Sequence, residues 1–416
     1  MKRSRLGGWG VLLSAAVVAA AVGGWMAETG ARAQSKGPVR IGALGTFAHV
    51  DGIAIINAAT LAVDEINAAG GIDGRPVVLF KYDDHASAAE AVRAFQRAVE
   101  RDRVDAVIGT FISEVTLPLE PWAARLHRPF IVTGSASNDI TKLIHDDYAR
   151  YRFVFHQWLN SEFIGRAVCD FARDVLVRKL GYSRAFVMSE DAAWTMPLDD
   201  SYLRCLPAAG LKVTGHIRFS PDTTDFTPIY NKIEATHPNV IIAGWSHTGL
   251  KPTLQWHNLQ VPALLAGVSA QAGDGTFWKS TNGATETVVT QTACGPGAAL
   301  SPKSIPFSDA YIKRFGSAPP YDAYTTYDAV YVLKQAVQRA HSTDPDPLVG
   351  ALEKTDYVGT IGRVEFYGRD SQFTHGLKYG KGYFTGVMIQ WQNGRQMTVW
   401  PAQTANAKPV VPAFVK

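Results

Sequence analysis

The chain alternates short apolar runs with amphipathic runs, and this alternation constrains its fold more than any other feature. Within residues 53–69, Ile56, Ala59, Val63 and Ile66 recur at the three- to four-residue spacing of one helix face. The strand-like apolar runs of this first block are residues 39–44, 77–82, 104–108 and 130–132. Strands that alternate with helices predict βαβ units and a mostly parallel, doubly wound sheet.

The same rhythm starts again after about residue 160. The strand-like runs of this second block are residues 185–188, 211–219, 240–242 and 263–265. A length of 416 residues allows about two to three domains. Two blocks of similar construction therefore predict two similar α/β lobes. Near the C-terminus, residues 383–391 and 397–400 are expected to form a hairpin that turns at Asn393-Gly394.

The N-terminus has the pattern of a secretory signal peptide. Three basic residues within the first five precede the uncharged stretch 6–27, and Ala31-Arg32-Ala33 then fits a small-x-small cleavage site. We expect residues 1–33 to be removed and the mature protein to be periplasmic. The alternative is an uncleaved membrane anchor, because the 22 uncharged residues could just span a bilayer. Most of the formal net charge of +4 lies in this segment, so the remainder is not basic enough to bind nucleic acid.

The three cysteines, Cys169, Cys205 and Cys294, include no C-x-x-C pair, which argues against a thiol-zinc site or a redox motif. Two alternatives stay open: three buried thiols, or one disulfide and one free thiol. If a disulfide forms, we expect it between Cys169 and Cys205. The predicted helices that carry these two residues flank the same strand, residues 185–188.

The sequence contains no motif that indicates catalysis, a metal or a cofactor. Gly42-Ala-Leu-Gly45 follows the first strand but lacks the G-x-G-x-x-G fingerprint of dinucleotide sites. Neither a phosphate-binding G-x-x-x-x-G-K-[ST] loop nor G-x-S-x-G nor H-E-x-x-H occurs. We interpret Asp83-Asp84-His85 as a polar loop with an Asp near the start of the next helix. The chain is therefore predicted to be a non-enzymatic protein without a cofactor or a metal.

Four loops follow the carboxyl ends of predicted strands, where open α/β sheets bind ligands. These loops are residues 110–113, 133–137, 189–194 and 244–247. Ser113 can cap the helix that follows it, which would leave backbone N–H groups to face a ligand carboxylate. The first two loops carry hydroxyls, and the last two carry Trp194 and Trp245. This arrangement suits a cleft for a small amphipathic molecule.

One stretch gives the chain a resemblance to a known family. Residues 62–77 read AVDEINAAGGIDGRPV and are followed by Tyr82-Asp83-Asp84. This run is similar to that of type I periplasmic solute-binding proteins of ABC importers, in the branched-chain amino acid (leucine/isoleucine/valine) group. Residues 107–109 and 327–330 support the resemblance, which extends from Val39 to about Trp400.

The resemblance implies an α/β fold of two doubly wound parallel-sheet lobes joined by a hinge of three chain crossings. Lobe one would comprise residues 39–157 and 292–380. Lobe two would comprise residues 158–291 and 381–400, and residues 401–416 would form a C-terminal arm. The two lobes would close over a ligand like a Venus flytrap.

The resemblance also implies a set of ligand-binding residues. Ser113 and the turn of Ser135, Ala136 and Ser137 would hold the ligand's carboxylate. Trp194 and Trp245 would close over the ligand from lobe two. Extra tryptophans at 158, 194 and 245 would suit an aromatic or larger apolar ligand.

Amino-acid-binding relatives usually place an acidic residue after the strand that ends here near Leu265, where it binds the ammonium group. This chain has Gly267-Val268-Ser269 at that place, with no carboxylate. We include Ser269 in the predicted site. Asp322, Glu114 or Asp51 could supply the missing carboxylate, and Asp322 is the one that we include.

The function predicted from these features is that of an exported, monomeric binding protein that delivers a small amphipathic carboxylate to an ABC importer by cleft closure. The carboxylate would be an amino acid or an aromatic acid, and the membrane permease of the importer would be the partner. The first alternative is a ligand-sensing periplasmic module that reports to a receptor. The second is an exported α/β enzyme, which would need a cofactor fingerprint that the sequence lacks.

Overall fold

The computed structural model describes residues 37–415. The predicted signal peptide, residues 1–33, and its cleavage site lie outside the described residues. Over residues 37–415, no helix is both long and apolar enough to cross a membrane.

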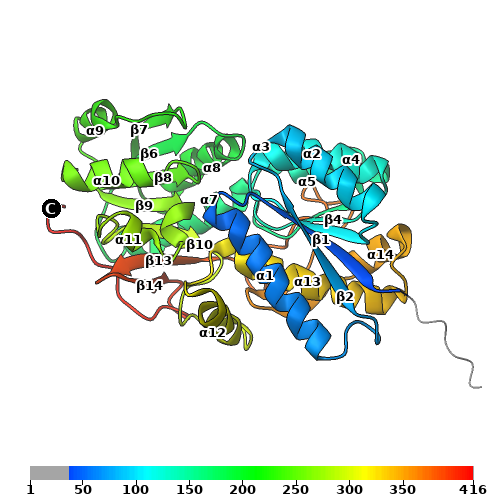
Figure 1. The fold of residues 1–416 in the computed structure, drawn as a ribbon. Coiled ribbons are helices and arrows are strands. Elements are labelled where there is room, and N and C mark those ends of the chain that lie inside the picture. The colour runs from blue at the N-terminus through cyan, green and yellow to red at the C-terminus, as the bar shows by residue number, and fades with distance from the viewer. Residues whose placement is uncertain (1–36, 416) are drawn as a thin grey trace, which may run out of the picture. The chain divides into compact units, whose positions relative to one another are not determined.

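The first sheet contains five parallel strands in the order β2-β1-β3-β4-β5. These strands are β1 (Val39–Gly45), β2 (Val77–Asp83), β3 (Ala106–Gly109), β4 (Phe130–Val132) and β5 (Val154–His156). The surrounding helices are α1 (Val50–Ala68), α2 (Ala88–Gln96), α3 (Ser113–Thr116), α4 (Glu120–Arg125), α5 (Asn138–Asp146) and α6 (Tyr148–Tyr151). Helix α1 lies beside α13 (Tyr321–Ala340), and Tyr331 of α13 donates a hydrogen bond to Glu65 of α1 at 2.9 Å (Figure 1).

The second sheet contains four parallel strands in the order β7-β6-β8-β9. These strands are β6 (Arg184–Glu190), β7 (Lys212–Phe219), β8 (Val240–Trp245) and β9 (Leu264–Ser269). The helices of this region are α7 (Ser161–Phe171), α8 (Thr195–Ala209), α9 (Thr227–Glu234), α10 (Leu250–Asn258) and α11 (Phe277–Ser280). A separate antiparallel sheet holds β10 (Val289–Thr292), β13 (Val387–Gln392) and β14 (Arg395–Trp400), so the predicted C-terminal hairpin is confirmed.

The chain passes three times between the elements around the first sheet and those around the second. It crosses after β5 into α7, and again after β10 into α12 (Ser304–Phe315). It then forms α13, α14 (Pro345–Leu352), β11 (Tyr357–Gly359) and β12 (Gly362–Val364) before it returns to β13. Two parallel sheets with three connections confirm the predicted fold class.

The glycine-rich run at residues 62–77 connects α1 to β2. Gly70 and Gly71 have φ angles of +94° and +81°, and a Cβ at Gly71 would lie 2.1 Å from the Arg75 carbonyl oxygen. Asn67 then binds both backbone groups of Val77, at 2.8 Å each. The run therefore ends the helix and fixes the start of the next strand.

A disulfide joins Cys169 of α7 to Cys205 of α8, across 36 residues of sequence. Cys294 is a free, buried cysteine. The structure therefore confirms the predicted pair and decides between the two alternatives that the sequence left open.

Candidate functional site

A pocket lies where the carboxyl ends of strands from both parallel sheets meet. It contains about 400 Å³ of space, open solvent included. Its lining residues are Phe111, Gly134, Ala136, Trp158, Ile164, Trp194, Ser246, Val268, Ala270, Gln291 and Tyr321. The first three follow β3 and β4 of the first sheet, whereas Ser246 and Val268 belong to the ends of β8 and β9 of the second. A molecule in this pocket would therefore touch both halves of the protein.

Four of the eleven residues that line the pocket are aromatic. The Trp158 ring packs against Tyr321 with a centroid distance of 4.7 Å, and the Tyr321 hydroxyl donates to the Gly134 carbonyl at 3.0 Å. Phe111 and Trp194 add two further rings to the lining. None of the lining residues is a lysine or an arginine. The pocket thus suits a small molecule with an apolar or aromatic body.

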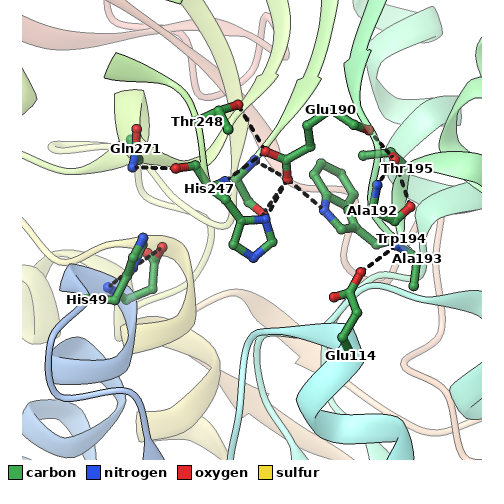
Figure 2. A network of polar contacts seen from close by, with 12 residues as sticks. His49, Glu114, Glu190, Ala192, Ala193, Trp194, Thr195, His247, Thr248 and Gln271 are labelled. Carbon is green, nitrogen blue, oxygen red and sulfur yellow. Dashed lines mark hydrogen bonds and ion pairs between the residues drawn. The ribbon is translucent and has the colours of Figure 1, made fainter. Parts of the chain in front are cut away.

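Glu190, at the end of β6, organises the pocket wall that the second sheet provides. Figure 2 shows hydrogen bonds that converge on its buried carboxylate from Trp194, His247 and Thr248. The backbone N–H and the hydroxyl of Ser246 also donate to it, at 2.9 and 3.0 Å. Since Trp194 and Ser246 line the pocket, Glu190 holds two of its lining residues in place.

The carboxylate of Glu190 pairs with His247, whose Nδ1 lies 2.8 Å from Oε1. Burial alone would raise the pKa of Glu190, but the hydrogen bond and positive charge of His247, with the backbone donors, hold that pKa below its ordinary value. Burial acts to lower the pKa of His247, yet the net effect of Glu190, Glu114 and Asp51 raises it. Both shifts favour the charged forms, so a buried carboxylate is paired with an imidazole that is partly exposed.

Two further contacts tie the halves of the site together. The Ala193 backbone N–H donates to Glu114 of α3 at 2.6 Å, as Figure 2 shows. The Ser161 hydroxyl, at the start of α7, contacts the carbonyl oxygens of Ala136 and Trp194 at 2.8 and 2.6 Å. The loop after β6 is thus held against the loops after β3 and β4.

Of the residues predicted for ligand binding, Ala136 and Trp194 line the pocket. Three serines lie directly behind the lining. Ser113 accepts a hydrogen bond from the Ser137 backbone N–H at 3.3 Å, and Ser137 caps α5 by accepting from Asp139 N–H at 3.2 Å. The Ser135 hydroxyl is hydrogen-bonded to Thr116. These serines join the two loops whose tips form the lining.

The structure places Trp245, Ser269 and Asp322 outside the lining. The Trp245 ring is fully buried in the core of the second sheet, 6.1 Å from the Phe219 ring, while its neighbour Ser246 lines the pocket. Ser269 is hydrogen-bonded through its backbone to the Thr290 hydroxyl at 2.9 Å. Asp322 is buried in the first turn of α13, next to the lining residue Tyr321. Their part in ligand binding stays a prediction.

Sequence reasoning missed Glu190, Gln291 and Tyr321. Glu190 could have been suspected, because it stands in the loop region 189–194 that the sequence singled out. Most of its donors, however, come from Ser246, His247 and Thr248, 56–58 residues away, and no local pattern links the two segments.

Two buried carboxyl groups, Asp51 and Asp322, lie behind residues that line the pocket: Asp322 follows Tyr321, and Asp51 contacts His49, whose ring packs on Phe111. Burial, together with the charge of Asp274, raises the pKa of Asp51 to about 7. Burial and the charge of Asp51 also raise the pKa of Asp322 well above its ordinary value. An acidic group whose pKa is higher in the folded than in the unfolded state favours folding at low pH, where both states hold the proton. This contribution is lost as the pH rises through the folded-state pKa.

We expect the Asp51→Asn variant to be less sensitive to pH than the wild type. Between about pH 4 and 7 the folded wild-type protein holds a proton on Asp51 that the unfolded chain has released. A pKa difference of one unit corresponds to about 1.4 kcal/mol of free energy. Between pH 4 and 7 the free energy of unfolding of the wild type should therefore fall by at least about 1.4 kcal/mol more than that of the variant. Urea denaturation at several pH values measures this difference. Asp64→Asn, on the exposed face of the same helix, is the control, and equal pH profiles for all three proteins would refute the expectation.

Comparisons with known proteins agree with this architecture. The sequence profile of the periplasmic binding protein family matches residues 38–381. The Leu/Ile/Val-binding protein BraC3 of Rhizobium johnstonii is 27% identical over 330 residues, which cover 76% of this chain and 83% of BraC3. The LivJ substrate-binding protein of Streptococcus pneumoniae, solved with isoleucine, has a TM-score of 0.75 and 21% identity, covering 86% of this chain and 97% of LivJ.

A second solved structure has a different ligand. It is a solute-binding protein of an ABC transporter from R. palustris in complex with benzoate. Its TM-score is 0.74 and its identity 18%, and the match covers 91% of this chain and 99% of that protein. The same fold therefore holds an aliphatic amino acid in one protein and an aromatic acid in another.

Proposed function

This chain belongs to the periplasmic binding protein family, and from that membership we propose that it captures a small amphipathic carboxylate and delivers it to an ABC importer. The carboxylate is an amino acid or an aromatic acid. The observation that carries the proposal is the pocket, whose aromatic and small lining residues come from the ends of both parallel sheets. Membership of this family makes the chain a solute-binding protein and not an enzyme, as its sequence predicted.

The proposed mechanism is cleft closure. Lobe one comprises residues 39–157 and 292–380, and lobe two residues 158–291 and 381–400, with residues 401–416 as an arm. The ligand bridges the lobes and stabilises the closed form, which the membrane permease recognises. The contacts of Ala193 with Glu114, and of Ser161 with Ala136 and Trp194, support this mechanism because they join loops from both lobes.

The proposed location is the periplasm, after cleavage near Ala33. The family is a periplasmic one, which supports this location. The basic start, the uncharged stretch 6–27 and the Ala31-Arg32-Ala33 site support the cleavage.

We expect Ser113→Ala to weaken binding of the carboxylate by roughly tenfold to a hundredfold. A hydrogen bond to a charged group contributes about 1.5–3 kcal/mol, which corresponds to that loss. The proposed anchor is Ser113 with the turn of Ser135, Ala136 and Ser137. Ser113 lies next to the pocket lining and contacts that turn through the backbone N–H of Ser137.

A thermal-shift screen of amino acids, benzoates and short carboxylates first selects the acid that stabilises the protein most. Calorimetry then compares this acid and its uncharged amide on the wild type and on Ser113→Ala. Weaker binding of the amide and of the variant is the expected result. Equal affinity for acid and amide would contradict the carboxylate anchor, and a screen in which no carboxylate stabilises the protein would contradict the proposed function.

A further inference from the structure

The pocket loop, residues 133–136, is held from outside through its backbone. It follows β4 and contributes two residues to the pocket lining. All four of its carbonyl oxygens accept a hydrogen bond from another element. Two of the donors belong to α13: the hydroxyl of Thr325 lies 2.5 Å from the Thr133 oxygen, and that of Tyr321 lies 3.0 Å from the Gly134 oxygen.

The other two carbonyls are bound by residues that flank the first crossing, residues 157–160, where β5 leads into α7. His156 ends β5, and its Nε2 lies 2.6 Å from the carbonyl oxygen of Ser135. Ser161 begins α7, and its backbone N–H donates to the carbonyl of Ala136 at 2.8 Å. Both His156 and Ser161 are fully buried. The pocket loop is thus attached to both ends of the crossing.

The Ser161 hydroxyl reaches a second lining residue. It lies 2.6 Å from the carbonyl oxygen of Trp194 and 2.8 Å from that of Ala136. A hydroxyl has one proton to donate, and Ala136 already accepts the Ser161 N–H, so the hydroxyl proton is left for Trp194. Ala136 follows β4 of the first sheet, whereas Trp194 follows β6 of the second, and both line the pocket. One residue at the crossing therefore holds lining residues from both sides.

The His156 ring makes one hydrogen bond, and that bond goes to the pocket loop. A carbonyl oxygen can only accept, so Nε2 carries the hydrogen. Burial lowers the pKa of His156 to about 4, so the ring is neutral at pH 7 and its Nδ1 carries no proton. Nδ1 has no hydrogen-bond partner among residues 37–415. The bond to Ser135 is therefore the polar contact that fixes this ring.

The crossing itself forms part of the pocket wall. Trp158, between His156 and Ser161, lines the pocket. Its ring packs on Tyr321 and, with a centroid distance of 5.8 Å, on Phe384 of the segment that leads into β13. When two lobes rotate about a hinge, the backbone of the connecting segments changes. Such a change between His156 and Ser161 would move one of them relative to the loop that both hold.

We propose that His156 and Ser161 are positioning residues that couple the pocket loop to the first crossing, so that the closed hinge holds the loop in its ligand-binding form. This inference rests on the proposed function and names the residues that link ligand contact to closure. Neither residue lines the pocket. Each acts through the backbone, because a bound carbonyl fixes the plane of its peptide bond. The two planes fixed in this way, after Ser135 and after Ala136, belong to the turn that the proposed function assigns to the carboxylate.

The test uses matched variants of these two residues. His156→Leu removes the ring donor, whereas His156→Gln keeps an N–H donor at about the distance of Nε2 along the side chain. Ser161→Ala removes the hydroxyl that binds Trp194. Ser201→Ala is the control, because this buried hydroxyl binds the Glu162 carbonyl at 3.1 Å between the same two helices and does not contact the pocket loop.

Stopped-flow fluorescence measures the association and dissociation rates, and urea denaturation measures the stability of each variant. The probe is L-leucine, L-phenylalanine or benzoate, whichever stabilises the wild type most. We expect His156→Leu and Ser161→Ala each to raise the dissociation rate by about threefold to tenfold, the loss of one neutral hydrogen bond, with the association rate near that of the wild type. His156→Gln should restore most of the slow dissociation, and Ser201→Ala should keep the wild-type rates whatever stability it loses.

The outcomes separate this inference from the proposed function. If the probe binds and both His156→Leu and Ser161→Ala dissociate at the wild-type rate, the two residues only stabilise the fold and the inference is wrong. Equal acceleration in Ser201→Ala, or in His156→Gln as in His156→Leu, would also overturn it. Ser161→Ala with its control decides the question if His156→Leu does not fold. If none of the three probes binds the wild type, the proposed function fails and the inference fails with it.

Discussion

Replacing Glu190 by glutamine is expected to lower the free energy of unfolding by about 1–3 kcal/mol, the usual effect of leaving buried hydrogen-bonding groups without a partner. The carboxylate accepts hydrogen bonds from Ser246, His247 and Thr248 and from the Trp194 indole. Both carboxylate oxygens of Glu190 accept hydrogen bonds, whereas the glutamine amide has a single acceptor oxygen. Its NH₂ group would face N–H and O–H groups that are themselves donors. The partly exposed His247 also loses its counter-charge.

The same replacement should weaken ligand binding, because Trp194 and Ser246 line the pocket and both are held by Glu190. Urea denaturation at pH 7 measures the stability, and calorimetry with the strongest ligand of the screen measures the affinity. Glu100→Gln, at an exposed position, is the control and should change neither. A Glu190→Gln protein with the stability and affinity of the wild type would show that the carboxylate does not organise the site.

Loss of the Cys169–Cys205 disulfide is expected to lower the free energy of unfolding by about 3–4 kcal/mol in the chain-entropy model, in which the effect grows with the length of the closed loop. The bond closes a loop across 36 residues and links α7 to α8, the helix that follows Trp194. The double variant Cys169→Ala/Cys205→Ala removes it, and denaturant titration measures the loss.

Reduction provides the matched control for this disulfide. With a reducing agent present, the wild type should fall to nearly the stability of the double variant, while the variant itself should not change. Cys294 is free and should have no part in the effect. If the oxidised wild type and the double variant unfold at the same denaturant concentration, the disulfide does not stabilise the protein.

The two parallel sheets could be predicted from the sequence because their strands are apolar and are separated by amphipathic helices. Strands β5 and β10 could not be predicted in the same way. Strand β5 reads Val-Phe-His and lies in a stretch that mixes aromatic with polar residues, and β10 reads Val-Thr-Gln-Thr, which carries too few apolar residues to form a distinct run. Strand β10 pairs with β13, which is distant in sequence, whereas β5 pairs with β4, the strand before it in the chain.

The loops that form the site could be predicted from the sequence, but only some of the side chains that line the pocket could be. Parallel strands end at one edge of a sheet, which is why loops 133–137 and 189–194 could be chosen. Which residue of a loop faces the pocket depends on local backbone geometry. At the end of β8, Trp245 faces the core and Ser246 the pocket, and large aromatic residues favour the core whenever one is available.

The most direct test of the central claim, that the ligand binds between the two sheets, is a fluorescence titration of the wild type and two variants with the strongest ligand of the screen. Trp194 lines the pocket, whereas Trp278 packs on Trp391 away from it, with a ring-centroid distance of 6.0 Å. We predict that the ligand changes the emission of the wild type, that Trp194→Phe loses most of this change, and that Trp278→Phe keeps it. A full response in Trp194→Phe, or its loss in Trp278→Phe, would contradict the claim.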